Sequence, residues 1–377
     1  MKIFNQENLE TIGKKTLNQS ELFKNRLSRN YKNLKKWARK NRVTCYRIYD
    51  KDIPEVPLAL DIYEFLPQEI EDKIQASKFI LNFNSQVSAN TSLGLELTKQ
   101  SKQRTYAVLY LYQRPYEKDE SEENKWLEVM KKTAASTLEI PEENVILKTR
   151  KKFDGRDDQY SKVESQHIVK GMVQEQGQLF TVNLSSYVDT GLFFDMRPLR
   201  KKIREISVNK NVLNLFCYTG SFSVYAAEGK AEKVTSVDLS NTYLEWAKSN
   251  MELNGFNDSE KYLYCRGDTL RFLDGKIKEN KEKFDIIILD PPTFSNSKKK
   301  DILMDINKDW PLYVNKCLEI LSPEGKLYFS TNSRRLQFDS QLIDSKFKVQ
   351  TEEITEQTIP EDYRNNKIHR AFLITFN

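Results

Sequence analysis

The sequence predicts an α/β protein with a doubly wound parallel sheet in its carboxyl-terminal half and an α+β domain before it. From residue 188 onward, strand-like apolar runs alternate with helical segments, as they do when helices connect parallel strands. Before that point, strands and helices occur without regular alternation. A chain of 377 residues is also longer than a single hydrophobic core usually serves. We therefore expect two domains, residues 1–185 and 186–377.

Seven segments of the carboxyl-terminal half have strand character. They are residues 212–216, 234–238, 262–265, 284–290, 326–330, 347–354 and 367–376, with helical segments between the first five. The last two are separated by Pro360 and a polar bend instead of a helix, which indicates a closing antiparallel pair. We expect a seven-stranded sheet.

The amino-terminal half contains a different mixture of elements. The patterns predict strands at 44–48, 58–66, 105–112 and 144–152, a helix at 126–138, and a hairpin formed by 167–173 and 178–183. Residues 67–104 are polar and rich in Ser, Asn, Gln and Lys. They indicate an insertion or a long excursion to which the sequence assigns no role.

Positive charge is concentrated in one predicted helix. Residues 24–42 contain nine lysines and arginines and no acidic residue, while an apolar stripe recurs at helical spacing at Phe23, Leu27, Tyr31, Leu34 and Ala38. A helix that packs by this stripe presents a basic face, which favours nucleic acid as a partner. The alternative is an ordinary solvated helix, but such helices usually carry both signs of charge.

Composition excludes several classes of protein. No apolar stretch approaches the ~20 residues that span a bilayer, and the start of the chain does not resemble a signal peptide, so we expect a cytoplasmic protein without a membrane partner. Because the four cysteines lie far apart, neither a metal site nor a disulfide framework is expected. The two histidines, His167 and His369, are more readily explained as structural than as catalytic residues.

Two loops of the predicted sheet indicate a cofactor site. The segment from Asn214 to Ser221 is a strand followed by a single glycine, Gly220, and a helix. Dinucleotide folds normally need G-x-G-x-x-G here to hold a pyrophosphate, so a cofactor without phosphate fits better, although such a turn is also common without any ligand. Asp238 ends the next strand eighteen residues after Gly220, where an acidic side chain typically binds ribose hydroxyls.

The next two strands are also followed by carboxylates. Asp268 is placed to meet an adenine edge, although capping the following helix is its more ordinary role. The buried run 284–289 ends in Asp290-Pro291-Pro292-Thr293-Phe294, where the prolines cannot extend a sheet ladder. A carboxylate, two prolines and an aromatic ring at a strand end suggest a site for a flat polar ring, with an ordinary strand end as the alternative.

Taken in order, these segments resemble the RlmK-type guanine-N7 methyltransferases of 23S ribosomal RNA, which often form the carboxyl half of a fused RlmKL protein. The resemblance extends from about residue 22 to the end of the chain. It is carried by the blocks 46–50, 147–150, 189–197, 214–221, 242–247 and 290–298, together with Arg364, Asn365, Ile368 and His369. The fold that this implies is a Rossmann-like class I methyltransferase with an amino-terminal RNA-binding domain.

The resemblance implies S-adenosyl-L-methionine as the cofactor and 23S ribosomal RNA, or a large-subunit assembly intermediate, as the partner. The cofactor-binding candidates are Asp195, Arg197, Asn214, Phe216, Tyr218, Gly220, Ser221, Asp238, Leu239, Asp268, Thr269 and Asp290. The catalytic candidates are Asp290, Pro291, Pro292 and Phe294. The RNA-binding candidates are Lys32, Lys35, Lys36, Arg39, Lys40, Lys148, Arg150, Lys298, Asn332 and Arg334.

The residues favour methylation of a ring nitrogen over methylation of carbon. Relatives that methylate cytosine at carbon five need a cysteine thiolate, commonly after the fifth strand or in a Pro-Cys turn, and residues 329–333 contain no sulfur. Guanine N7 already carries a lone pair and has no proton to remove. The rate therefore depends mainly on how well the enzyme aligns N7 with the methyl group of the cofactor. We expect Asp290 to accept hydrogen bonds from the guanine or to stabilise the product's charge. Phe294 would stack on the base, with core packing as its alternative.

Two other functions remain open at this stage. An exocyclic amino methyltransferase, acting on guanine N2 or adenine N6, also uses Asp/Asn-Pro-Pro turns, but its aromatic residue usually follows the prolines directly, whereas Thr293 intervenes here. The chain could also be a catalytically silent RNA-binding assembly factor that kept the fold. Two departures from the family pattern are the missing amino-terminal units of the fused protein and the apparently longer segment 67–104.

Overall fold

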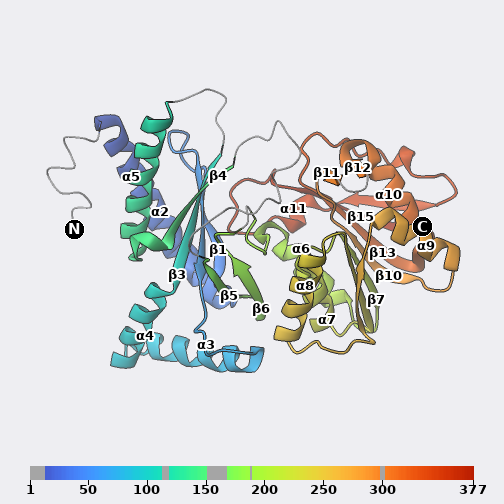
Figure 1. Ribbon diagram of the computed structural model, residues 1–377, viewed down its shortest axis with the longest axis horizontal. Helices are drawn as coiled ribbons and strands as arrows, with labels where there is room; N and C mark the ends of the chain where they lie inside the picture. The colour runs from blue at the N-terminus through green and yellow to red at the C-terminus, as the bar shows by residue number, and fades with distance from the viewer. Residues whose placement is uncertain (1–12, 113–118, 151–167, 187–188, 298–301) are drawn as a thin grey trace. The chain divides into compact units, whose positions relative to one another are not determined.

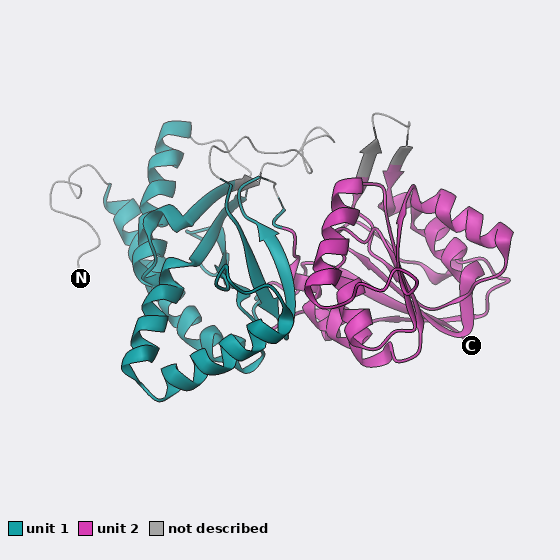
Figure 2. Cartoon of the chain, turned by 60° about the horizontal axis from the view of Figure 1, so that its bottom comes forward, with its two compact units in different colours: residues 1–154, 158–190, 362–364 teal, residues 155–157, 191–361, 365–377 magenta. Residues whose placement is uncertain are grey.

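The computed structural model describes residues 13–112, 119–150, 168–186, 189–297 and 302–377 (Figure 1). The chain divides into two compact units (Figure 2). Unit 1 comprises Met1–Asp154, Asp158–Thr190 and Asp362–Arg364, and unit 2 comprises Gly155–Asp157, Gly191–Glu361 and Asn365–Asn377. Of the predicted sites, His167 and Lys298 lie outside the described residues.

Unit 1 is built on a four-stranded sheet. Its strands are β1 (Cys45–Asp50), β2 (Leu58–Glu64), β3 (Thr105–Tyr112) and β4 (Val145–Arg150), in spatial order β1-β2-β3-β4. The first two pairs are antiparallel and β3 pairs with β4 in parallel, through α5 (Glu120–Leu138). Unit 1 also contains a hairpin of β5 (Lys170–Glu175) and β6 (Gln178–Asn183).

The basic helix packs by the predicted stripe. It is α2 (Lys14–Lys40), which begins about ten residues earlier than the charge pattern suggested and lies beside α5 (Figure 1). Phe23, Leu27 and Ala38 are buried in the core of unit 1, and Tyr31 and Leu34 pack partly against it. The stripe therefore docks the helix and leaves its basic residues on the outer side.

The segment 67–104 forms a helical hairpin that the sequence analysis did not resolve. Its helices are α3 (Lys73–Ser88), capped by Asp72, and α4 (Ser92–Gln103), capped by Thr91. They cross closely at Gly94, because a Cβ added there would lie 2.3 Å from the carbonyl oxygen of Gln86. The predicted excursion is thus an ordered part of unit 1.

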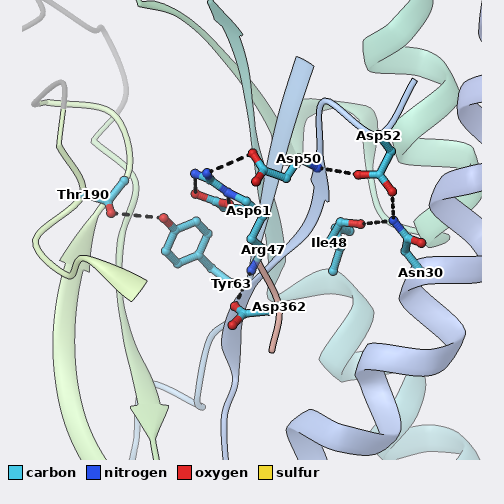
Figure 3. Close-up of polar contacts among 9 residues, drawn as sticks. All are labelled: Asn30, Arg47, Ile48, Asp50, Asp52, Asp61, Tyr63, Thr190 and Asp362. Carbon is cyan, nitrogen blue, oxygen red and sulfur yellow. Dashed lines mark hydrogen bonds and ion pairs between the residues drawn. The ribbon is translucent and has the colours of Figure 1, made fainter. Parts of the chain in front are cut away.

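Three residues from far down the chain also belong to unit 1 (Figure 3). In this return segment, residues 362–364, the Asp362 carboxylate accepts a hydrogen bond of 3.0 Å from the backbone N–H of Arg47. The guanidinium of Arg47 lies 4.5 Å from the centroid of the Tyr363 ring. It also donates to both carboxylate oxygens of Asp61, at 2.7 and 3.1 Å. The return segment therefore covers a buried charge on β1.

Unit 2 contains the predicted seven-stranded sheet. Its strands are β7 (Asn211–Leu215), β8 (Lys233–Asp238), β9 (Tyr262–Arg266), β10 (Phe284–Leu289), β13 (Leu321–Thr331), β14 (Val349–Glu353) and β15 (Arg370–Phe376). The spatial order is β14-β15-β13-β10-β7-β8-β9, and β15 is antiparallel to both of its neighbours. The strand order reverses between β7 and β10, which brings the carboxyl ends of these strands to one rim where open sheets bind ligands.

Helices cover both faces of this sheet (Figure 1). One layer is formed by α6 (Arg197–Ile206), α7 (Ser221–Glu228) and α8 (Asn241–Leu253), and the other by α9 (Thr269–Glu279) and α10 (Ile306–Ile320). A hairpin of β11 (Phe294–Ser297) and β12 (Ile302–Asp305) follows the proline turn, and α11 (Thr355–Thr358) precedes β15. The architecture is the predicted Rossmann-like α/β fold. Within the described residues, no helix is long and apolar enough to cross a membrane.

Candidate active site

The loop after β7 has an unusual backbone. Phe216, Tyr218 and Gly220 all have positive φ angles, of 55°, 51° and 76°. Side chains other than glycine rarely adopt this conformation, and such strain tends to persist at functional sites. Gly220 also permits close helix packing, because a Cβ there would lie 2.7 Å from the Cβ of Ala247 on α8. The glycine is therefore needed for the fold, independently of any ligand.

The side chain of Asn214 lies beneath this loop. It is 1% exposed, and its amide donates to the hydroxyl of Ser223 at 2.9 Å. That hydroxyl in turn pairs with the Ser236 hydroxyl at 2.8 Å. The structure thus uses the Asn214 side chain to join β7, α7 and β8, whereas the sequence analysis placed it among the ligand contacts.

Asp238 lies where the spacing predicted, at the end of β8. One carboxylate oxygen accepts from the backbone N–H of Tyr218 at 3.0 Å, and the other accepts from that of Ser240 at 2.8 Å. Burial raises the pKa of Asp238, and these backbone donors oppose the rise. Since a carboxylate oxygen accepts more than one hydrogen bond, the group retains capacity for a ligand hydroxyl.

Asp268 caps the helix that follows it, which was the alternative to a contact with adenine. Its Oδ1 accepts from the backbone N–H of Arg271 at 3.0 Å, at the start of α9. The following residue, Thr269, is buried in the first turn of that helix. Capping occupies one carboxylate oxygen and orients the group at the rim.

Asp290 lies at the end of β10, and its carboxyl group has a raised pKa. The hydroxyl of Ser330 donates to its Oδ1 at 2.6 Å, because β10 and β13 pair with Leu289 opposite Phe329. Burial raises the pKa of Asp290 to about 6, with the nearby Asp195 adding to the rise. The Ser330 hydroxyl, His369 and Arg200 oppose it. A carboxylate that titrates near neutral pH in a cleft is typical of functional sites.

His369 connects β15 to this group of charges. Its Nδ1 lies 3.4 Å from Oδ2 of Asp195, and its Nε2 shares a hydrogen bond of 2.8 Å with the hydroxyl of Thr358. The imidazole is fully buried. Arg200 is also buried and donates to the carbonyl oxygen of Phe193 at 2.8 Å. The rim thus holds the buried side chains of Asp195, Arg200 and His369 beside the partly buried Asp290.

Comparison with known proteins identifies the family. Residues 96–356 match the family model described as S-adenosylmethionine-dependent methyltransferase. The chain is 38% identical over 352 residues to the Ribosomal RNA large subunit methyltransferase K of Neisseria meningitidis, covering 93% of this chain and 86% of that protein. The chain belongs to the S-adenosylmethionine-dependent methyltransferase family.

Other relatives of this methyltransferase are longer. The Ribosomal RNA large subunit methyltransferase K/L of Magnetococcus marinus is 37% identical over 357 residues, which cover 94% of this chain but 43% of that protein. The chain therefore spans less than half the length of that relative. Two solved structures share the fold, with 94% of this chain covered: SMU.776 complexed with SAH, at 19% identity and TM-score 0.65, and a SAM-dependent methyltransferase from Streptococcus mutans, at 18% and 0.63.

The methyltransferase presents groups that fit S-adenosylmethionine, its cofactor. Asp238 and Asp268 offer carboxylate oxygens to hydroxyl and amino groups at neighbouring strand ends. The carboxylates of Asp195, which is buried, and Asp290, which is partly buried, suit a positively charged ligand. Leu239 and Ser221 are partly buried at the same rim, where Ser221 begins α7. When bound, the cofactor supplies an electrophilic methyl group.

The proline turn leaves an aromatic ring accessible. Phe294 begins β11 and is 43% exposed, so the alternative of core packing is wrong. Pro291 is buried and Pro292 is partly buried. The ring is therefore available to a ligand that approaches Asp290.

Aromatic side chains surround Tyr218. Its ring lies 4.6 Å from that of Tyr243 and 5.3 Å from that of Phe193, with Trp246 at 6.5 Å. Gly191 makes room for Trp246, because a Cβ there would lie 2.4 Å from the indole. The sequence blocks 189–197 and 242–247 contained these rings, but nothing in either block alone indicated that they meet.

The predicted basic residues differ in exposure. Lys32, Lys36, Arg39 and Lys40 are exposed on α2, as are Asn332 and Arg334 in unit 2. Lys35 is partly buried over the Tyr31 ring at 5.2 Å, and burial lowers its pKa. Lys148 is partly buried in β4, and the side chain of Arg150 lies outside the described residues. The exposed lysines of α2 are thus the clearest candidates for phosphate contacts.

Proposed function

We propose that this methyltransferase modifies guanine N7 in 23S ribosomal RNA, either in free RNA or in a large-subunit assembly intermediate in the cytoplasm. The observation that carries the proposal is the Asp290 turn, with a partly buried carboxylate of raised pKa followed by two prolines and the exposed Phe294. The printed name of the Neisseria relative, a large-subunit ribosomal RNA methyltransferase, supports the choice of RNA.

The chemistry of the unit 2 cysteines supports nitrogen over carbon as the methyl acceptor. Burial raises the pKa of Cys217, Cys265 and Cys317, so each is held as a thiol. Methylation at carbon five of a pyrimidine needs a thiolate nucleophile. Guanine N7 needs no nucleophile and no base, because its lone pair lies in the ring plane and carries no proton.

In this proposal, each group at the rim has a positioning or electrostatic role. Asp290 accepts hydrogen bonds from the guanine N1–H and amino group, or stabilises the positive charge that the ring gains. Ser330 fixes the rotamer of Asp290 by its 2.6 Å hydrogen bond. Phe294 stacks on the base after it leaves its helix. Asp195 and Arg197 flank the cofactor, and Asp238 binds its ribose.

Cleavage at N7-methylguanosine tests the proposal. We expect 23S RNA from cells lacking the gene to lose one borohydride- and aniline-dependent cut, whose position also gives the address of the nucleotide. The wild-type gene should restore the cut, and Asp290→Ala should not. An unchanged cleavage pattern in the deletion strain would remove the N7 assignment. Restoration by Asp290→Ala would remove the role of that carboxylate.

A further inference from the structure

A pocket lies in unit 1. It is bordered by the end of α2, the end of β2, helix α3 and strand β5. It contains about 540 Å³ of space free of protein atoms, counting the part open to solvent. Much of this space is open to solvent, so the feature is a hollow on the surface of unit 1 and not an enclosed cavity.

One side of the pocket is aromatic. Phe65, Phe79 and Phe83 all line it, and each is only partly buried. Phe79 and Phe83 stand one turn apart on α3, with ring centroids 6.1 Å apart and planes inclined by 29°. Partly exposed phenyl rings beside a hollow offer a stacking surface for a flat ring.

Three arginines border the same pocket. Arg39 and Arg42 are exposed, and Arg104 is partly buried. Burial lowers the pKa of Arg104, and its Nε is a buried donor with no hydrogen-bond partner among the described residues. Buried polar groups without a partner are uncommon, and a ligand is one ordinary reason for one.

Acceptor groups complete the lining. Gln174 is 1% exposed, and its Oε1 has no hydrogen-bond partner in the part of the chain that the structure describes. Glu64 is partly buried, and burial raises the pKa of its carboxyl group against the opposing charges of Lys35, Lys102 and Arg39. The pocket thus combines stacking rings, cations, an unpaired donor and two acceptors.

We propose that this pocket binds one unpaired nucleotide of the RNA substrate, separate from the nucleotide that is methylated. The base lies against the phenyl rings and its amino group donates to Gln174 or Glu64. The phosphate lies at Arg39 and Arg42. The acceptors favour adenine, cytosine or guanine, whose exocyclic amino group offers two N–H donors, over uracil, which offers only its ring N3–H. This inference rests on the proposed function in that its ligand is RNA.

The location of the pocket accords with the basic surface of unit 1. Lys36 and Lys40 are exposed on the same helix that supplies Arg39, so a strand bound along α2 passes the pocket. Helix α3 belongs to the segment 67–104, which had no assigned role in the sequence. The pocket gives that segment a function in choosing the RNA.

Binding of short RNAs to the full-length protein without cofactor tests the inference. The probes are labelled oligouridines that carry one central A, C, G or U, and fluorescence anisotropy at fixed salt gives their dissociation constants. We expect an amino-bearing central base to bind about tenfold more tightly than uridine, the order of one hydrogen bond. Gln174→Leu should abolish this preference and leave the affinity for the all-uridine probe unchanged. Phe83→Leu should weaken binding of all four probes without changing the salt dependence, because every base stacks.

Lys40→Ala is the matched control, because it should weaken binding of all four probes equally. Thermal unfolding verifies that each variant is folded. Because Phe83 and Gln174 line different sides of the pocket, the other variant still tests the inference if one of them fails to fold. A wild-type protein that binds all four probes alike overturns the inference. So does a folded Gln174→Leu variant that keeps the preference, or a folded Phe83→Leu variant that binds all four probes as tightly as the wild type. The binding assay measures no methyl transfer, so its outcome can be interpreted even if the N7 assignment is wrong.

Discussion

Replacing Asp290 by asparagine should remove the acidic limb of the pH–rate profile. Burial raises the pKa of this carboxyl group to about 6 in the folded protein. The group is then about 90% ionised near pH 7 and about 10% ionised near pH 5. If the charged form holds the guanine, kcat/KM for RNA falls about tenfold across this range in the wild-type enzyme.

The asparagine variant keeps an oxygen that accepts from Ser330 but loses the charge. Its rate should be lower by about a hundredfold, the order of removing one group that stabilises developing charge, and flat between these pH values. The assay is transfer of labelled methyl groups to a 23S RNA transcript at subsaturating RNA. An acidic limb that persists in Asp290→Asn, or a wild-type profile without one, would refute the role of this carboxylate.

The same substitution makes a prediction about stability. The pKa of Asp290 is raised from its ordinary value of 3.8 to about 6, so the folded state binds this proton more tightly than the unfolded state does. The carboxyl group therefore contributes less stability as pH rises from 3.8 to about 6, by at most about 3 kcal/mol. Urea unfolding near pH 7 should show Asp290→Asn to be more stable than the wild type, with no gain near pH 3.

Three further substitutions have matched readouts. Gly220→Ala should destabilise the protein by about 2–4 kcal/mol and weaken cofactor binding in calorimetry, because a Cβ there meets Ala247. Gly255 also has a positive φ, of 84° against 76° at Gly220, but a Cβ there has no neighbour within 4 Å, so Gly255→Ala should cost about 1 kcal/mol. Phe294→Leu should leave the melting temperature unchanged, since the ring is 43% exposed, and should lower kcat/KM for RNA about tenfold through loss of stacking. A lower melting temperature with normal kinetics would contradict this prediction. Lys36→Ala should reduce the slope of log affinity for RNA against log salt by about one, while Lys248→Ala on α8 should not change it.

The sequence predicted elements well where burial and chain pattern agree. Strand β3 has the predicted bounds, Thr105–Tyr112, because its apolar run is flanked by Arg residues and is buried in the sheet. Helices α3 and α4 were missed because Leu81 and Leu95 stay exposed, at 70% and 69%, so no buried stripe marked them. Asp72 and Thr91 were the readable signals, as capping residues.

The sequence predicted the rim positions of residues that directly follow a strand, but not of residues that reach the rim through the pairing of distant strands. Asp238 and Asp290 follow apolar runs, so their place at the rim could be read along the chain. Ser330 and His369 meet that rim only because β13 lies beside β10 and β15 beside β13. The paired residues of these strands lie 37 to 49 positions apart in the chain, and pairing over such separations is not encoded in local periodicity.

The return segment has a practical consequence for dissecting the molecule. Because residues 362–364 supply Asp362 to the backbone of Arg47 and Tyr363 to its guanidinium, no single cut in the gene yields a complete unit 1. A fragment that stops at residue 190 would expose a buried cation and an unsatisfied amide on β1. A fragment that lacks these three residues would therefore be less stable, and the result could be mistaken for an intrinsic instability of the whole unit. A synthetic peptide spanning residues 362–364, added to the fragment, would restore the missing contacts and with them the stability.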